Sequence, residues 1–225
     1  MKTSVNNLNQ YIDHTLLKAN ATLNDIEILI EEAKKFQFKA VCLNPYWVKT
    51  AADLLKDSNI LICTVIGFPL GATTLESKVF ETKDALNNGA DEIDMVINIG
   101  ALKDKNYSYV LKEIKEVVKA ADGKTVKVII EIALLTEEEI IKASQLVVKA
   151  GANFVKTSTG FSTSGATISA VKLIKATVLD KSFIKAAGGI KNQAMMRAMI
   201  EAGADRIGTS SGVALIKDEN STDKY

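Results

Sequence analysis

The sequence predicts an α/β fold, a single-domain (β/α)8 TIM barrel, on three observations. Its 225 residues are close to the roughly 250 residues of a typical barrel of this kind. Short runs rich in β-branched residues alternate with longer segments of helical period, as in parallel strands joined by crossover helices. Eight strand-like runs are present, and eight strands with intervening helices favour a closed barrel. We assign residues 1–217 to the barrel and residues 218–225 to a polar, flexible tail.

Each expected strand is a short apolar run that ends where glycine, proline or polar residues begin. The first run is the least apolar. The second and third runs are followed by Pro45 and Pro69, whose fixed φ angles shape the loops there. In chain order the strands are expected at residues 10–13, 40–43, 60–66, 92–96, 126–132, 154–157, 183–187 and 206–209.

The segments between these strands place apolar residues at three- and four-residue steps, which predicts helices with one buried face. Gly89, Gly151 and Gly203 each follow such a segment and precede a strand, and glycine suits the left-handed conformation that ends a helix. The helices are expected at residues 22–36, 46–56, 74–87, 107–121, 137–150, 167–178 and 193–202.

The candidate catalytic residues stand in the strands. Five residues past those three glycines come Asp94, Lys156 and Gly208, near the strand ends where a barrel places its active site. Asp94, Lys156 and Lys185 interrupt strands that are otherwise apolar, and burying an unpaired charge is costly. A buried ion pair between Asp94 and one lysine would leave the other lysine without a partner. We therefore expect these three residues to carry chemistry.

Two neighbouring amines suit attack on a carbonyl carbon. A free lysine is protonated and not nucleophilic near neutral pH. At about 5 Å and an effective dielectric constant of about 20, a second cation costs the first about 3 kcal/mol. Burial adds to that cost. One of the two lysines, Lys156 or Lys185, can therefore become a neutral nucleophile, and Asp94 can move protons.

Glycine and hydroxyl residues gather after the last three strands. In barrels the loops after strands seven and eight commonly bind phosphate. Backbone N–H groups of such loops, and of a helix beginning near Ser210, suit a dianion. The expected phosphate-binding residues are Gly160, Gly188, Gly189, Gly208, Ser210 and Ser211.

The composition narrows the class of partner. The formal net charge is +1 and the pI is about 7.6, which gives no overall field for nucleic acid or anionic lipid. A small-molecule partner is expected. The sequence has no apolar run of membrane-spanning length and no signal-like N-terminus, so we expect a cytoplasmic protein. Cys42 and Cys63 lie in apolar runs and are expected to be reduced core thiols.

The remaining ionisable candidates are assigned supporting roles. His14 is the single histidine, which gives no histidine-rich metal site and no histidine relay. We expect no metal and no cofactor. His14 is expected to be structural rather than to orient substrate. Glu131 is expected to support a lysine, with a place in the proton relay as the alternative.

Several motifs in the same order resemble the deoxyribose-phosphate aldolase family. The resemblance runs from about Ile12 to Ile216, which is nearly the whole chain. Its motifs are IDHTLL at 12–17, VCLNP at 41–45, GFPLG at 67–71, EIDMV at 92–96, FVKTSTG at 154–160, IKAAGGI at 184–190 and RIGTSS at 206–211.

The resemblance implies a class I aldolase that reversibly cleaves 2-deoxy-D-ribose 5-phosphate into D-glyceraldehyde 3-phosphate and acetaldehyde without a metal. By this resemblance Lys156 forms the Schiff base, Lys185 disfavours the protonation of Lys156, and Asp94 relays protons. The glycines and serines named above form the phosphate cradle. The resemblance also implies a cytosolic homodimer or homotetramer that serves deoxynucleoside breakdown.

Three positions depart from the family pattern. Ile132 stands where the family often has threonine, Ala186 stands where many members have proline or serine, and Phe161 replaces a cation found in some members. Two other functions stay open: a phosphate-binding barrel isomerase that uses acid–base chemistry only, and a non-catalytic sugar-phosphate sensor. The terminal Tyr225 is expected in a frayed tail, with a role over the phosphate end as the alternative.

Overall fold

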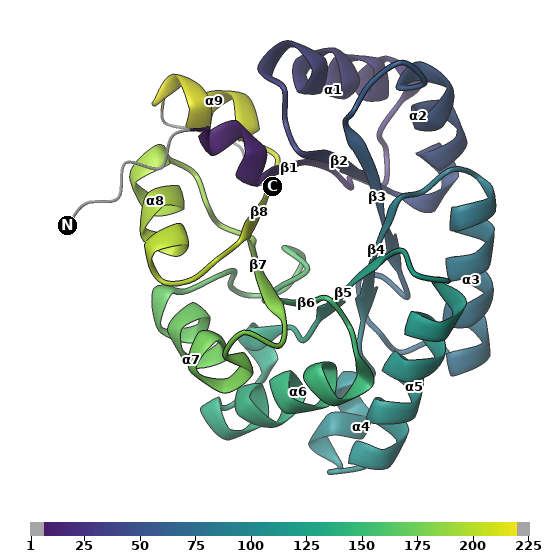
Figure 1. The fold of residues 1–225 in the computed structure, drawn as a ribbon, viewed down its shortest axis with the longest axis vertical. Helices are drawn as coiled ribbons and strands as arrows, with labels where there is room; N and C mark the ends of the chain where they lie inside the picture. The colour runs from purple at the N-terminus through teal and green to yellow at the C-terminus, as the bar shows by residue number, and fades with distance from the viewer. Residues whose placement is uncertain (1–6, 220–225) are drawn as a thin grey trace.

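The computed structural model describes residues 7–219, which form a closed ring of eight parallel strands surrounded by helices (Figure 1). The strands follow one another around the ring in chain order, and β1 pairs with β8 to close it. The predicted (β/α)8 barrel is therefore confirmed. The strands are β1 (Ile12–Leu16), β2 (Ala40–Leu43), β3 (Leu61–Ile66), β4 (Glu92–Val96), β5 (Thr125–Ile129), β6 (Phe154–Lys156), β7 (Phe183–Ala187) and β8 (Arg206–Thr209).

The helices lie outside the ring (Figure 1). They are α1 (Leu23–Phe36), α2 (Val48–Leu54), α3 (Leu75–Asn87), α4 (Ile99–Lys103), α5 (Tyr107–Ala120), α6 (Glu137–Ala150), α7 (Ile168–Val178), α8 (Gln193–Glu201) and α9 (Gly212–Lys217). Short 3-10 helices occupy Leu8–Tyr11, Pro45–Trp47 and Ile132–Leu134.

The main hydrophobic core lies between the strands and the helices. Ile26 of α1, Val110 of α5 and Ile174 of α7 belong to one buried cluster with strand residues such as Val128 and Ile184. Because side chains alternate along a strand, the neighbours of these strand residues point into the barrel. The inward positions are therefore free to hold polar groups.

Three helices begin one residue later than predicted because a threonine precedes them. The Thr22, Thr74 and Thr167 side chains each accept a hydrogen bond from a backbone N–H in the first turn. They cap N–H groups that have no partner within the helix. At α2 the predicted helix is divided into a 3-10 turn, which contains Pro45, and a shorter α-helix.

The strand predictions were wrong by one residue at one end of β3 and of β6, and by more at β1 and β5. The first strand is Ile12–Leu16 rather than residues 10–13, because a 3-10 helix occupies Leu8–Tyr11. The polar residues Asp13, His14 and Thr15 gave this segment a weak strand pattern, but all three are buried in the closed barrel. The fifth strand ends at Ile129, because Glu131 is in the left-handed conformation with a φ of 56°. The short α4 was not predicted.

The C-terminal tail is only partly described. Residues 218 and 219 follow α9, and the remainder, including Tyr225, lies outside the described residues. The tail and the role of Tyr225 therefore stay predictions. Among residues 7–219, no helix is both long enough and apolar enough to cross a membrane.

Candidate active site

Seven charged side chains meet inside the barrel. Each is at most 6% exposed to solvent, so the group is almost entirely cut off from water. The strand register brings them together: Asp94 pairs with Lys127, and Lys156 pairs with Lys185, on neighbouring strands. The seven are Asp13, Glu92, Asp94, Lys127, Lys156, Lys185 and Arg206.

Asp94 is the centre of this network. Its Oδ2 atom lies 2.8 Å from Nζ of Lys156 and 2.7 Å from Nζ of Lys185. Its Oδ1 atom lies 2.9 Å from Nζ of Lys127 and 3.1 Å from Sγ of Cys63. The structure thus brings together the three predicted catalytic residues on one carboxylate oxygen. It also adds Lys127, which the sequence argument did not select.

Charges in the network fix the protonation of its members. Burial raises the pKa of Asp94, but Lys127, Lys156 and Lys185 outweigh burial and hold it well below its ordinary value. Burial lowers the pKa of Lys185, but Asp13 and Asp94 outweigh it and raise the pKa well above its ordinary value. Asp94 is therefore a carboxylate and Lys185 an ammonium throughout the neutral range.

Arg206, Glu92 and Asp13 hold the side chains of Lys127 and Lys185 in place. The Arg206 guanidinium binds Glu92 through two hydrogen bonds of 3.1 and 2.9 Å and also contacts Asp13. Lys127 Nζ lies 2.7 Å from Oε2 of Glu92. Burial raises the pKa of Asp13, but Lys185 and Arg206 lead the charges that lower it well below its ordinary value. The catalytic candidates are therefore held by buried side chains that contact one another through several hydrogen bonds.

The expectation that one lysine lacks a partner was wrong. Lys185 contacts both Asp13 and Asp94, and Lys156 contacts Asp94. What distinguishes Lys156 is the balance of charge. Within the described network, three carboxylates face three other cations, so Lys156 is the fourth cation. The interior is electrically neutral when the Lys156 amine is neutral.

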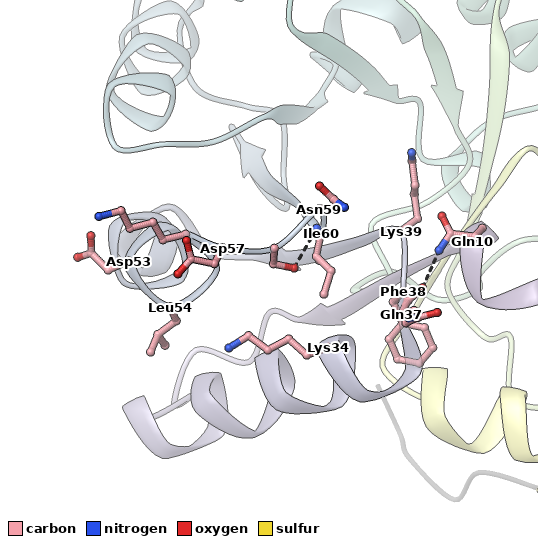
Figure 2. Close-up of a pocket in the computed structure, with 12 residues that line it drawn as sticks. Gln10, Lys34, Gln37, Phe38, Lys39, Asp53, Leu54, Asp57, Asn59 and Ile60 are labelled. Carbon is pink, nitrogen blue, oxygen red and sulfur yellow. Dashed lines mark hydrogen bonds between the residues drawn. The ribbon is translucent and has the colours of Figure 1, made fainter.

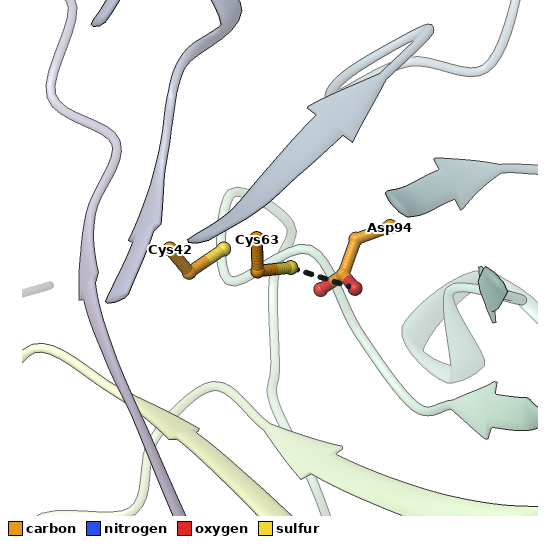
Figure 3. A group of neighbouring side chains, drawn as sticks. All are labelled: Cys42, Cys63 and Asp94. Carbon is orange, nitrogen blue, oxygen red and sulfur yellow. Dashed lines mark hydrogen bonds between the residues drawn. The ribbon is translucent and has the colours of Figure 1, made fainter. Parts of the chain in front are cut away.

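Cys42 and Cys63 are buried free thiols, as predicted, but they belong to a small apolar cluster that is separate from the main core. Figure 3 shows the two cysteine side chains with Asp94. Burial raises the pKa of Cys63 well above its ordinary value, so it stays a thiol and donates to Asp94. The two sulfurs and an Asp94 oxygen are close enough to ligate one metal ion. However, the Lys127 ammonium lies 3.3 Å from the Cys63 sulfur and already neutralises this carboxylate. The donor set therefore fits an ammonium group rather than a metal ion.

All six predicted phosphate-binding residues line one pocket of about 200 Å³ at the carboxyl ends of β6, β7 and β8. Gly165 and Gly188 allow the loops to meet, because a Cβ atom on Gly165 would lie 2.1 Å from the carbonyl oxygen of Gly188. Gly208 joins the pocket to the charged network, since a Cβ there would lie 3.0 Å from Cε of Lys185.

The pocket also contains residues that the sequence argument did not select. Lys191 supplies a cation directly after the Gly188-Gly189-Ile190 segment, and its place two residues past a glycine pair was a usable signal. Phe161 does not belong to this pocket. The further lining residues are Ser162, Ser164, Gly165, Ile190, Lys191 and Thr209.

The supporting residues lie elsewhere. His14 Nε2 lies 2.7 Å from Oε2 of Glu32 on α1, outside the barrel interior, which agrees with a structural role. Glu131 was expected to support a lysine, but within the described residues it has no lysine at ion-pair distance. Instead Glu131 Oε2 accepts hydrogen bonds from the backbone N–H and the hydroxyl of Thr159. It thereby fixes the loop that leads to Gly160.

A larger cavity, of about 650 Å³, lies at the opposite end of the barrel (Figure 2). Lys39 and Ile60, which line it, directly precede β2 and β3. None of the seven network residues lines this cavity. The candidate active site is therefore the carboxyl end of the barrel, where Lys156 lies, and not this larger cavity.

Comparison with known proteins gives one consistent result. Residues 8–218 match the DeoC/LacD family aldolase group. Deoxyribose-phosphate aldolase from Staphylococcus saprophyticus is 59% identical over 219 residues, which span 97% of this chain and 100% of the relative. The enzyme of that name from Geobacillus sp. is 57% identical over 221 residues, 98% and 99% of the two chains. The deoxyribose phosphate aldolase of Aeropyrum pernix, described as having a unique tetrameric structure, superposes with a TM-score of 0.87 at 34% identity and covers 93% of this chain and 89% of its own.

Proposed function

We propose, because the chain belongs to the DeoC/LacD family of aldolases, that this aldolase reversibly cleaves 2-deoxy-D-ribose 5-phosphate. The products are D-glyceraldehyde 3-phosphate and acetaldehyde. The observation that carries the proposal is the sharing of one Asp94 oxygen by the amines of Lys156 and Lys185. An amine that must lose its proton to react stands beside a permanent cation.

Lys156 is the nucleophile of the proposed reaction. Its neutral amine attacks the C1 aldehyde carbon of the open-chain sugar to form a carbinolamine. Uptake of a proton, relayed from water by Asp94, lets the C1 hydroxyl leave as water and leaves a protonated Schiff base. The C3 hydroxyl then loses its proton, the C2–C3 bond breaks, and its electron pair moves into the Schiff base to form an enamine. Protonation of the enamine at C2 and addition of water release acetaldehyde and restore the amine.

Lys185 and Asp94 control this cycle from one side. The Lys185 ammonium, held by Asp13 and Asp94, disfavours a second positive charge on Lys156. When the Schiff base forms, Asp94 is the carboxylate nearest the developing positive charge, and it stabilises that charge. Asp94 also passes protons between the amine and water, since its Oδ2 atom touches both lysines.

The pocket after β6, β7 and β8 is proposed to hold the 5-phosphate. Gly160, Gly188 and Gly189 have positive φ angles, and the exposed N–H groups of such loops suit a dianion. The hydroxyls of Ser210 and Ser211 add donors. A Cβ atom on Gly208 would lie 3.0 Å from Cε of Lys185, so the pocket borders the lysine pair. The sugar then lies between the anion-binding pocket and the Lys156 amine.

The cellular setting is also a proposal. The family resemblance supports a cytoplasmic enzyme of deoxynucleoside breakdown and a homodimer or homotetramer. The tetrameric structure described for the Aeropyrum pernix enzyme supports the higher assembly.

A borohydride trap tests the proposed nucleophile. Acetaldehyde and borohydride should leave one ethyl group on Lys156, located by mass mapping, and should abolish activity. The matched control is Lys181→Met, because Lys181 is an exposed lysine just before β7. The control variant should be trapped at Lys156 like the wild type. An unmodified Lys156 under saturating acetaldehyde would contradict the Schiff-base mechanism. A modified Lys156 also argues against an acid–base isomerase or a sensor, neither of which needs an amine nucleophile.

A further inference from the structure

A second buried ion pair lies outside the barrel interior, between α3 and α5. Lys78 Nζ lies 2.6 Å from Oε1 of Glu113, and both side chains are 0% exposed. Lys78 also donates to the backbone carbonyl oxygens of Gly71 and Val96, each at 2.8 Å. Glu113 Oε2 accepts from the backbone N–H of Asn98 at 2.9 Å. The pair therefore holds backbone groups that follow β3 and end β4.

In this pair burial outweighs the effect of the charged partner, whereas in the barrel interior the charged partners outweigh burial. Burial lowers the pKa of Lys78 and raises the pKa of Glu113, and each partner offsets only part of that effect. Both shifts favour the neutral forms. A buried pair of this kind contributes little net stability compared with apolar side chains of the same size. We therefore look for the role of the pair in the backbone groups that it binds, rather than in the stability that it adds.

The backbone that the pair holds is the loop between β3 and α3. Gly67 N–H donates to Oε2 of Glu81 at 2.7 Å, and Gly71 N–H donates to the Gly67 carbonyl at 2.8 Å. A Cβ atom on Gly71 would lie only 1.9 Å from the carbonyl oxygen of Ile97. The loop is thus fixed at Gly67 by Glu81 and at Gly71 by Lys78, in direct contact with the chain after β4.

Phe68 is the aromatic residue that this loop presents. It packs against a small apolar cluster made of Leu17, Cys42, Cys63 and Val65, which is separate from the main core. Cys63 in turn donates to Asp94, so the cluster borders the charged network.

Phe68 also reaches the loop after β6. Its ring meets the Phe161 ring edge-on, at 5.3 Å between centroids and an interplanar angle of 88°. Phe161 directly follows Gly160, which lines the candidate phosphate pocket. Phe68 therefore connects the apolar side of the barrel mouth to the loop that follows β6, the strand that ends at Lys156.

We propose that the Lys78–Glu113 pair positions Phe68 as the apolar wall of the substrate site beside Lys156. Lys78 and Glu113 are positioning residues, because they act on substrate through the Gly67–Gly71 loop and Phe68. The wall packs against the carbon chain of the sugar, while the phosphate pocket binds its anionic end. This inference rests on the proposed aldolase chemistry at Lys156.

The test compares Lys78→Met, Phe68→Ala and the double variant in the cleavage of 2-deoxy-D-ribose 5-phosphate. Loss of one apolar contact in a site is worth about 10-fold or more in discrimination. Each single variant should raise KM about 10-fold, with kcat changed less than about 3-fold. The double variant should match Phe68→Ala, because residues that act through one another are not additive.

The matched control is Lys103→Met, which removes another lysine–glutamate pair of 2.6 Å, with Glu139, from the protein surface. This control should keep the wild-type KM. A further threefold or greater rise of KM when Lys78→Met is added to Phe68→Ala would overturn the proposal. A fall in kcat at unchanged KM would also overturn it, since that is the result expected of a general structural defect.

Glu113→Gln keeps the test decisive if Lys78→Met does not fold. The amide retains an oxygen for the Asn98 N–H but removes the charge that faces Lys78. It should raise KM in the same direction by a smaller factor, and a wild-type KM would overturn the proposal. Borohydride trapping separates this result from the fate of the proposed function. An untrapped wild-type Lys156 rejects the aldolase mechanism, whereas normal trapping with an unchanged KM rejects only the role of the pair.

Discussion

The barrel interior is built mainly from side chains, whereas the proposed phosphate pocket is built mainly from backbone. In the interior, carboxylates and cations on strands face one another in a region that excludes water. In the pocket, the shape is set mainly by the backbone, because Gly160, Gly188 and Gly189 take positive φ angles that other residues rarely adopt. The only lysine that lines the described pocket, Lys191, is exposed.

This difference predicts how each region responds to substitution. A charge removed from the interior leaves its partners buried and unpaired, which costs stability and shifts protonation. A charge removed from the pocket leaves water in its place, so the loss is confined to binding. Under the proposed function, the interior therefore sets reactivity and the pocket sets affinity.

Lys127→Met should have the largest effect on the free energy of unfolding. Lys127 is fully buried, and Glu92 and Asp94 each lie within 2.9 Å of its amine. Its removal should destabilise the protein by about 3–5 kcal/mol at pH 7, as measured by urea unfolding. Lys124→Met is the control, since Lys124 forms a half-exposed pair with Asp91 that is worth at most about 1 kcal/mol.

The pH dependence of that loss sharpens the prediction. The pKa of Asp94 is lowered in the folded wild type, with Lys127 as a principal cause. Such a carboxylate contributes stability above its unfolded pKa, and the contribution is lost as pH falls through its folded pKa. The gap between Lys127→Met and the wild type should therefore narrow below about pH 4. A constant gap would show that packing, and not charge, is the function of Lys127.

Lys127 also shows where prediction from the sequence stops. The barrel, most strand ends and the cluster of Asp94, Lys156 and Lys185 could be predicted, because periodicity and motif order are local properties of the chain. Lys127 stands in a segment where polar and apolar residues alternate, which is typical of a strand with one face exposed to solvent. Only the closed register places it against Asp94. A charged residue in any strand of a barrel buried on both sides was the missed signal.

The same limit applies to other missed residues. Asp13 was placed at the end of a misassigned strand, although it contacts Lys185 from β1. Lys78 lies in a helix with a weakly amphipathic sequence, and no local pattern marks it as buried. Its partner Glu113 is 35 residues away in the chain, so the pair exists only through helix packing. By contrast, the six residues proposed to bind phosphate do line one pocket, and they could be grouped from the sequence because glycines in loops after strands are visible there.

Lys185→Leu should have the next largest effect, on reactivity. With Lys185 absent, a protonated Lys156 balances the interior charge, so the reactive amine should appear only at higher pH. A loss of about 3 kcal/mol in cation repulsion corresponds to roughly 2 pH units. We expect kcat/KM at pH 7 to fall about 100-fold. The part of the pH–rate profile in which kcat/KM rises with pH should move to higher pH by about 1 to 2 pH units. These magnitudes follow from about 1.4 kcal/mol per unit.

The pH–rate profile is the measurement that checks the Lys185 prediction. Lys181→Leu is the control, because this exposed lysine lies just before the same strand. It should leave both limbs of the profile in place. If Lys185→Leu had a lower rate but the wild-type profile, Lys185 would serve position rather than charge.

Lys191→Ala should have the smallest effect, confined to the phosphate. Removing one charge-assisted contact from an exposed site should raise KM for 2-deoxy-D-ribose 5-phosphate about 10-fold, with kcat almost unchanged. KM for unphosphorylated 2-deoxy-D-ribose should not change. Lys172→Ala, an exposed lysine of α7 outside the pocket, is the control.

Because salt screens exposed charges and barely reaches buried ones, raising the ionic strength should shrink the Lys191 effect and leave the pH profile of the wild type in place. An equal rise of KM for both sugars would remove Lys191 from the phosphate site and would weaken the division between a reactive interior and a binding rim.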